Sequence, residues 1–167
     1  MQHAEKSRVV GPGRAGEFLT FALDHETFAI PVEAVREVVD PLPTAQVPRA
    51  PDFAPALVNV RGNVVALIDL RRRLAMPPAP ADAEARVVVS EVAIGGEPTL
   101  VGIQTDAVHG VIDVRGAVVE PLPKLGTRWR TEFIQGVVRQ DRGFVIILDM
   151  ARILAPDDAA RRSTDRG

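Results

Sequence analysis

Side chains that could carry out catalysis or bind ligands are few in this chain and lie far apart. The 167 residues include no cysteine, which excludes thiol nucleophiles, disulfides and thiolate metal sites. The three histidines are His3, His25 and His109, and no two of them have the i+3 or i+4 spacing of a helical ligand pair. We therefore expect no bound metal and no cofactor.

Carboxylates are available for acid–base chemistry, but a structural role as a cap or turn former is the favoured interpretation of each of them. Asp69 and Asp149 each follow an apolar run, where a helix N-cap would accept hydrogen bonds from backbone N–H groups. Asp106 follows a third such run, and no G-x-S-x-G turn supplies a serine nucleophile. We expect no catalytic residues, and an enzyme using Asp69, Asp106 and His109 stays as an alternative.

Arginine is the remaining chemically distinctive residue. The run Arg71-Arg72-Arg73 would point to different sides of a helix, so it predicts a solvated helix start and no basic stripe. The chain has 20 basic and 22 acidic residues, a net charge of −2 that provides no general attraction for nucleic acid. We expect no nucleic-acid partner.

A single arginine is placed differently, in the segment Asn59-Val60-Arg61-Gly62-Asn63. It stands beside a glycine at the tip of two strongly apolar runs. Arginine presents a rigid fork of donors and is enriched at interface hot spots. The pattern alone leaves two interpretations equally open, an ordinary solvated turn and an anchor for a partner.

Strands must position these residues, because apolar side chains recur every second residue along most of the chain. We count about nine or ten short strands, with helix only at Asp69–Leu74 and Asp149–Leu154, two segments that resemble each other. Many short strands separated by turn signals favour small barrels or a sandwich. The residues predicted to be buried are Leu19, Phe21, Phe28, Ile30, Val58, Val60, Val65, Leu67, Val88, Ile103, Ile146 and Leu148.

Composition indicates one globular domain, with 46% hydrophobic and 25% charged residues. We expect flexible tails at residues 1–16 and 157–167, a domain over 17–156, and an exposed, mobile proline-rich linker at 76–85. No apolar run approaches the roughly 20 residues that span a bilayer, and the N-terminus lacks a signal peptide. We therefore expect a cytoplasmic protein with no direct membrane insertion.

Four segments in order resemble the CheW family, the adaptors of bacterial chemosensory arrays. The resemblance runs from about Glu17 to Leu154. The segments are FALDHETFAIPVEAVREVV, RAPDF with LVNVRGNVVALIDLRRRL, LVGIQTDAVHGVIDV, and FIQGVVRQDRGFVIILDMARIL. Two departures stand out: Ala56, preceded by Pro55, occupies a position where the family usually has glycine, and Ala66 one where it often has proline.

The resemblance implies two small five-stranded SH3-like β-barrels around a shared core, and no catalysis. It also implies an adaptor that bridges the cytoplasmic tip of a chemoreceptor to the regulatory domain of a CheA-type histidine kinase. Other CheW-like domains are further expected partners, and recruitment to membrane receptor arrays would occur through these partners. The N-x-R-G and V-x-E elements of the family, as they stand in this sequence, imply the partner-binding residues Arg61, Asn59, Gly62, Val35 and Glu37. A β-barrel module that binds a small molecule, without a kinase partner, is the alternative function.

Overall fold

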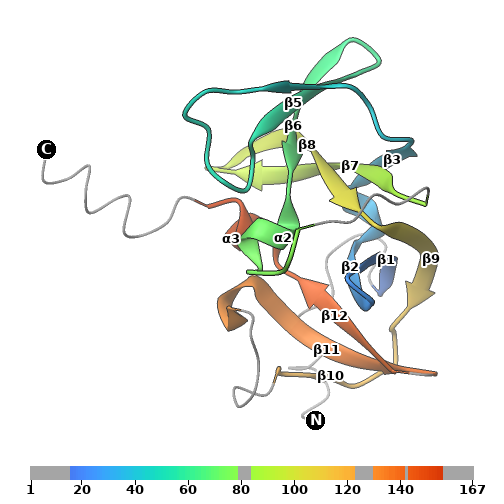
Figure 1. The fold of residues 1–167 in the computed structure, drawn as a ribbon. Helices are drawn as coiled ribbons and strands as arrows, with labels where there is room; N and C mark the ends of the chain where they lie inside the picture. Colours follow the sequence, from blue (N-terminus) through green and yellow to red (C-terminus); the bar gives the residue numbers. More distant parts are fainter. Residues whose placement is uncertain (1–15, 79–83, 123–129, 142, 156–167) are drawn as a thin grey trace, which may run out of the picture.

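Two β-sheets with little helix make up the computed structural model, which describes residues 16–78, 84–122, 130–141 and 143–155 (Figure 1). The first sheet has the order β10 (Val119–Glu120), β11 (Ile134–Gln140), β12 (Gly143–Leu148), β2 (Glu26–Pro31), β1 (Glu17–Leu23), β9 (Ala107–Asp113). The second has the order β3 (Val35–Val39), β7 (Arg86–Ile94), β8 (Glu97–Thr105), β6 (Asn63–Ile68), β5 (Ala56–Val60), β4 (Thr44–Gln46). The predicted mainly-β fold of two subdomains is confirmed, with six strands in each sheet where five were expected.

Each half of the chain contributes its first hairpin to the sheet built by the other half. The β1–β2 hairpin lies in the first sheet with β9 to β12, and the β7–β8 hairpin lies in the second sheet with β3 to β6. One junction in each sheet is a parallel pair, with Phe28 opposite Ile146 in one and Gly102 opposite Leu67 in the other. The second junction is antiparallel, between β1 and β9 and between β3 and β7. The two subdomains are therefore interlocked, since neither is a continuous piece of chain.

The two halves repeat the same local structure eighty residues apart. The backbone N–H of Asp69 donates to the carbonyl of Phe53 at 2.8 Å, and that of Asp149 donates to the carbonyl of Phe133 at 2.9 Å. The matching positions with identical residues include Phe53 and Phe133, Val65 and Val145, Asp69 and Asp149, Arg72 and Arg152, and Leu74 and Leu154. This repeat supports the interpretation of two related β units.

Both predicted helices are present as single turns with the predicted caps. The carboxylate of Asp69 accepts from the backbone N–H of Arg71 before α2 (Leu70–Arg73), and that of Asp149 accepts from Arg152 before α3 (Met150–Ile153). Two further one-turn 3-10 helices, η2 (Val32–Ala34) and η3 (Thr131–Phe133), were not predicted. Within the described residues, no helix has the length and apolarity to cross a bilayer.

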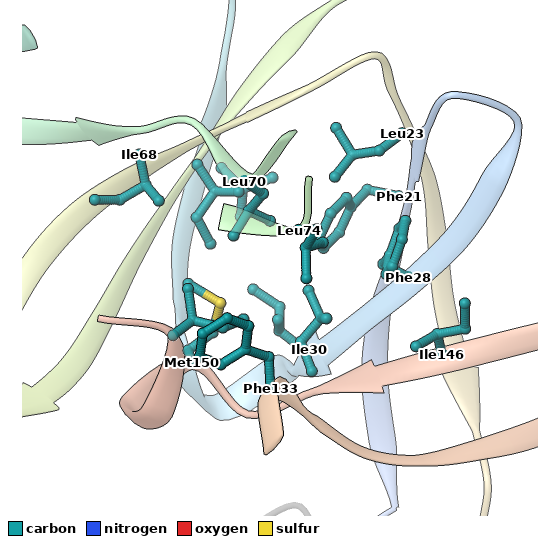
Figure 2. Close-up of a cluster of buried hydrophobic side chains, with 14 of the residues drawn as sticks. Phe21, Leu23, Phe28, Ile30, Ile68, Leu70, Leu74, Phe133, Ile146 and Met150 are labelled. Atoms are coloured by element: carbon teal, nitrogen blue, oxygen red, sulfur yellow. The ribbon is translucent and has the colours of Figure 1, made fainter. Parts of the chain in front are cut away.

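The core lies between the sheets and is shared by both subdomains. Figure 2 shows side chains from β1, β2, β6, β12 and the helical turns converging on one cluster, with the rings of Phe21 and Phe28 stacked at 6.2 Å. Each sheet also has a smaller cluster of its own. All twelve residues predicted to be buried are buried. Eight of them lie in the shared core, and Val58, Val60, Val65 and Leu67 lie in the smaller cluster of the second sheet. Period-two alternation predicted them correctly because one face of each strand meets one of these clusters.

Three strands escaped prediction, and each lacks a clear alternation. The first is β3, which begins at Val35 directly after the turn η2. The others, β4 and β10, are only three and two residues long.

The expected tails and linker fall largely outside the described residues. Gly16, assigned to the N-terminal tail, is buried, and its carbonyl accepts from the N–H of Val114 at 2.7 Å. In the linker, Pro77, Pro78 and Glu84 are exposed as predicted, but Met76 is half-buried against the central core. The mobility of the linker stays a prediction, and residues 79–83 of it lie outside the described residues.

Candidate partner-binding site

The Arg61-Gly62 turn joins β5 to β6 through a two-residue loop, because Val60 pairs directly with Asn63. Arg61 has a φ of 51° and Gly62 a φ of 87°. Positive φ at both loop residues is typical of a type I′ hairpin turn, which favours Asn or Gly. Arginine in the left-handed region costs roughly 1–3 kcal/mol, and such strain tends to be kept at functional sites. The turn thus holds an arginine where folding alone favours another residue.

The guanidinium of Arg61 is held at one edge and open at the other. Its Nε donates to both carboxylate oxygens of Glu37, at 3.0 and 3.1 Å. Glu37 comes from β3, which lies in the same sheet but is separated from β6 by two strands, β7 and β8. The Arg61 side chain is nevertheless 79% exposed. The ion pair therefore orients the arginine and leaves its outer nitrogens facing solvent.

Four of the five predicted site residues come together at this turn. The side-chain oxygen of Asn59 accepts from the backbone N–H of Gly62 at 2.8 Å and so fixes the loop that carries Arg61. Val35 does not join them. A β-bulge separates it from Glu37 on β3, and Val35 is half-buried against the central core.

The corresponding hairpin of the first sheet, β11–β12, presents a different surface. Val64 follows the first tip and is 71% exposed; Phe144, eighty residues later, is 57% exposed. Where the first tip has Arg61, the second has the exposed Asp141, beside a surface hollow of about 600 Å³ that Phe144 also lines. The molecule thus displays two equivalent hairpin tips, each with an exposed apolar residue but with different charged neighbours.

A buried ion pair that sequence reasoning missed joins the two subdomains. Arg71 donates to both oxygens of Asp106 at 2.5 and 2.7 Å, and its side chain is only 5% exposed. Asp106 stands between β8 of the second sheet and β9 of the first, and also accepts from the backbone N–H of Asp24 at 2.8 Å. The prediction of a solvated arginine run was wrong for Arg71, because α2 turns this member of the run inward; Arg72 is exposed.

This pair has shifted titration properties. The hydrogen bonds from Arg71 are the largest cause that lowers the pKa of the Asp106 carboxyl, outweighing the opposing effect of burial. The same interaction raises the pKa of Arg71. Asp106 is thus held ionised as a structural carboxylate, whereas a general acid at neutral pH needs a raised pKa.

The other residues of the enzyme alternative are also accounted for. Asp69 caps α2, and together with Asp106 it lines a cavity of about 210 Å³. His109 is exposed on β9 and is not among the residues that line this cavity. The cavity is smaller than the roughly 300–1,000 Å³ of ordinary ligand pockets, which counts against a substrate site at Asp69 and Asp106.

Two interlocked sheets around a shared core define the class as a mainly-β protein of two SH3-like subdomains. The sequence profile of the CheW-like domain matches residues 17–157. The chain belongs to the CheW-like family.

Individual relatives agree with this assignment. The chain is 24% identical over 143 residues to the probable chemotaxis protein CheW of Rhizobium etli, covering 86% of this chain and 90% of the relative. It is 27% identical over 157 residues to the chemotaxis protein CheW of Klebsiella aerogenes, covering 94% and 92% respectively. The crystal structure of the scaffolding protein TtCheW from Thermoanaerobacter tengcongensis superposes with a TM-score of 0.74 at 26% identity, covering 85% of this chain and 89% of that one.

Proposed function

We propose that this chain is a non-catalytic adaptor that couples chemoreceptors to a CheA-type histidine kinase in a bacterial chemosensory array. The chain would bind the kinase regulatory domain, the cytoplasmic tip of the receptor and other CheW-like domains. It would act in the cytoplasm and reach the membrane array through these partners. The CheW-like relatives, named as chemotaxis and scaffolding proteins, support the general role.

The observation that carries the proposal is the presentation of Arg61. A strained backbone, the Asn59–Gly62 hydrogen bond and the Glu37 carboxylate all act to hold one exposed guanidinium in place. An arginine ordered before binding loses less conformational entropy when it meets a carboxylate or carbonyls on a partner. Val35, half-buried at the start of β3, would add an apolar contact at the margin.

The two hairpin tips support an adaptor with more than one partner. The tip with Arg61 and Val64 suits an acidic rim around an apolar pocket, whereas the second tip presents Phe144 with the guanidinium of Arg139 over its ring. Different partners can then occupy opposite subdomains simultaneously. Two unlike docking surfaces on one small rigid body are what a bridging protein requires.

Substitution of Arg61 tests the proposal. Arg61→Ala should weaken binding by roughly 2 kcal/mol or more, about thirtyfold in Kd, while stability changes by no more than about 0.5 kcal/mol. Arg61→Asn should weaken binding equally and raise the melting temperature, because asparagine suits the left-handed turn position better. Calorimetric titration against the cognate receptor tip and the cognate kinase regulatory domain measures the affinities, and thermal melts measure stability.

The matched control is Arg115→Ala. Arg115 is also an exposed arginine paired through Nε with a carboxylate, that of Asp113. Its replacement should leave both affinities unchanged. Failure of the unmodified chain to bind either partner would overturn the adaptor function, and unchanged affinity of Arg61→Ala for both would overturn the anchor role alone.

A further inference from the structure

A groove rich in arginine lies at the opposite end of β6 from the Arg61 turn. It has a volume of about 700 Å³ and runs between the loop before β5, the end of α2 and the ends of η3 and α3. Arg49, Arg72, Arg73 and Arg130 line it, against one acidic lining residue, Asp52. In a chain of net charge −2, four arginines converging from three separate segments form a local positive surface.

Three of the arginines, Arg49, Arg72 and Arg130, have side chains that reach solvent and are able to meet an incoming partner. Arg72 contacts Asp69 at 3.5 Å, and Arg130 pairs with Glu132; all four side chains in these pairs reach solvent. Exposed pairs of this kind contribute little to stability, so an incoming carboxylate can compete for the same donors. Arg49 is exposed at a positive φ of 62°, and no ion pair to it is found among the residues that the structure describes.

The floor of the groove is apolar. Phe53 and Leu154 line it, and the guanidinium of Arg73 lies 4.3 Å from the centre of the Phe53 ring. Arg73 also donates to the carbonyls of Ile153 and Ala155 at 2.7 and 2.8 Å, which fixes it as part of the wall. Since Arg73 covers a face of the Phe53 ring, that face is not free to stack on a nucleic-acid base.

We propose that this groove is a third docking surface, and that it binds an acidic peptide segment of a partner protein. Charge complementarity selects carboxylate side chains for the guanidinium groups of Arg49, Arg72 and Arg130, and the apolar lining selects aliphatic side chains between them. This surface is separate from the Arg61 turn. A variant that lacks the Arg61 side chain should therefore still bind the acidic peptide in the groove.

The test uses the full chain and a fluorescein-labelled peptide of alternating glutamate and leucine, with binding followed by fluorescence anisotropy. Binding should weaken as salt rises, because exposed charges are screened. The double variant Arg49→Glu, Arg72→Glu should raise the peptide Kd by roughly tenfold or more. Two control variants should leave the peptide Kd unchanged. They are Arg115→Glu, a charge reversal at a residue that does not line the groove, and Arg61→Ala.

Four outcomes would overturn the proposal. They are no binding of the acidic peptide, an equal affinity for a matched lysine–leucine peptide, equal losses in the groove variant and in Arg115→Glu, and stronger competition from oligo-dT than from unlabelled peptide. Thermal melts accompany each variant. Because Arg49 and Arg72 are both exposed, the double variant should stay folded.

Discussion

Asp106 gathers three donors from different parts of the chain onto one carboxylate. Two come from Arg71 of α2 and one from the backbone of Asp24 in the β1–β2 turn. Arg71 Nε is also buried, with no hydrogen-bond partner among the described residues. Loss of the carboxylate would leave an uncompensated charge in the interior.

Asp106→Ala should therefore cost about 3–5 kcal/mol in the free energy of unfolding. Urea denaturation measures this loss. Asp113→Ala, which removes an exposed partner of Arg115, is the control and should barely move the midpoint. The double change Asp106→Leu, Arg71→Met should recover much of the loss, since apolar residues of similar volume can replace a buried ion pair. Equal midpoints for Asp106→Ala and the control would contradict the structural role.

The acid dependence of stability follows from the same pair. The pKa of Asp106 is lowered in the folded state, so its contribution is fully present above the unfolded pKa of about 3.9. That contribution decreases as the pH falls from there toward the lowered folded pKa. The stability gap between the unmodified chain and Asp106→Asn should accordingly narrow below about pH 4. A gap that stays constant to pH 2 would argue against the lowered pKa.

At the residue scale, sequence reasoning found what is local. The caps Asp69 and Asp149 were predictable because an N-cap depends on a few neighbouring residues. The partner of Arg71 was not, because Asp106 lies 35 positions away and meets it only through tertiary folding. Family motifs marked Glu37 and Arg61 as residues of one surface, but their ion pair was not predicted, because it joins two strands that are not neighbours in the second sheet.

At the element scale, the repeat offers a controlled comparison between Ala56 of β5 and Gly136 of β11, which occupy equivalent positions eighty residues apart. A Cβ on Gly136 would lie 2.6 Å from a methyl group of Val119 and 3.0 Å from the carbonyl oxygen of Glu120. Ala56 has a Cβ and is buried within its sheet cluster. Only the β11 position therefore excludes a side chain.

Gly136→Ala should thus lower stability by about 1–3 kcal/mol, the usual cost of overpacking, and loosen β10 from the sheet edge. Ala56→Gly should cost less, about 0.5–1 kcal/mol, from backbone entropy. Thermal melts rank the two variants, and hydrogen exchange at Val119 reports on β10. The reverse ranking would show that β10 adapts without strain.

Element prediction succeeded where burial gives a period of two and failed at short or irregular edges. The β5 and β6 strands alternate against a core and were read correctly. The edge strand β3 contains a bulge between Val35 and Glu37, which interrupts its alternation. The pairing of β2 with β12 joins residues more than a hundred positions apart, and no local pattern specifies it.

At the scale of the whole molecule, the exchanged hairpins make the halves depend on each other. Residues 1–80 contain β1 to β6, but β1 and β2 find their neighbours β9 and β12 in the other half. In either half alone, the exchanged hairpin, β1–β2 or β7–β8, would lack the strands that flank it, and the remaining strands of that half would lack the hairpin of the other. Folding is therefore expected to be a property of the complete chain.

Separately expressed fragments 1–80 and 81–167 should each be largely unfolded and should associate 1:1 into a native-like complex when mixed. Circular dichroism and size-exclusion chromatography measure both steps. Limited proteolysis of the intact chain within residues 79–83 should give the same complex in nicked form. A fragment that melts cooperatively on its own would show that its sheet is independent of the exchange.

The passage of the chain between the sheets also determines how the molecule responds to load. Within the described residues, the chain passes from one sheet to the other twice, through the single turn of η2 and at Asp106, whose carboxylate is held by its ion pair with Arg71. A hinge needs several residues free to change their backbone angles, and neither crossing offers them. A force applied to one subdomain is therefore expected to move both subdomains together, with no change in their relative orientation.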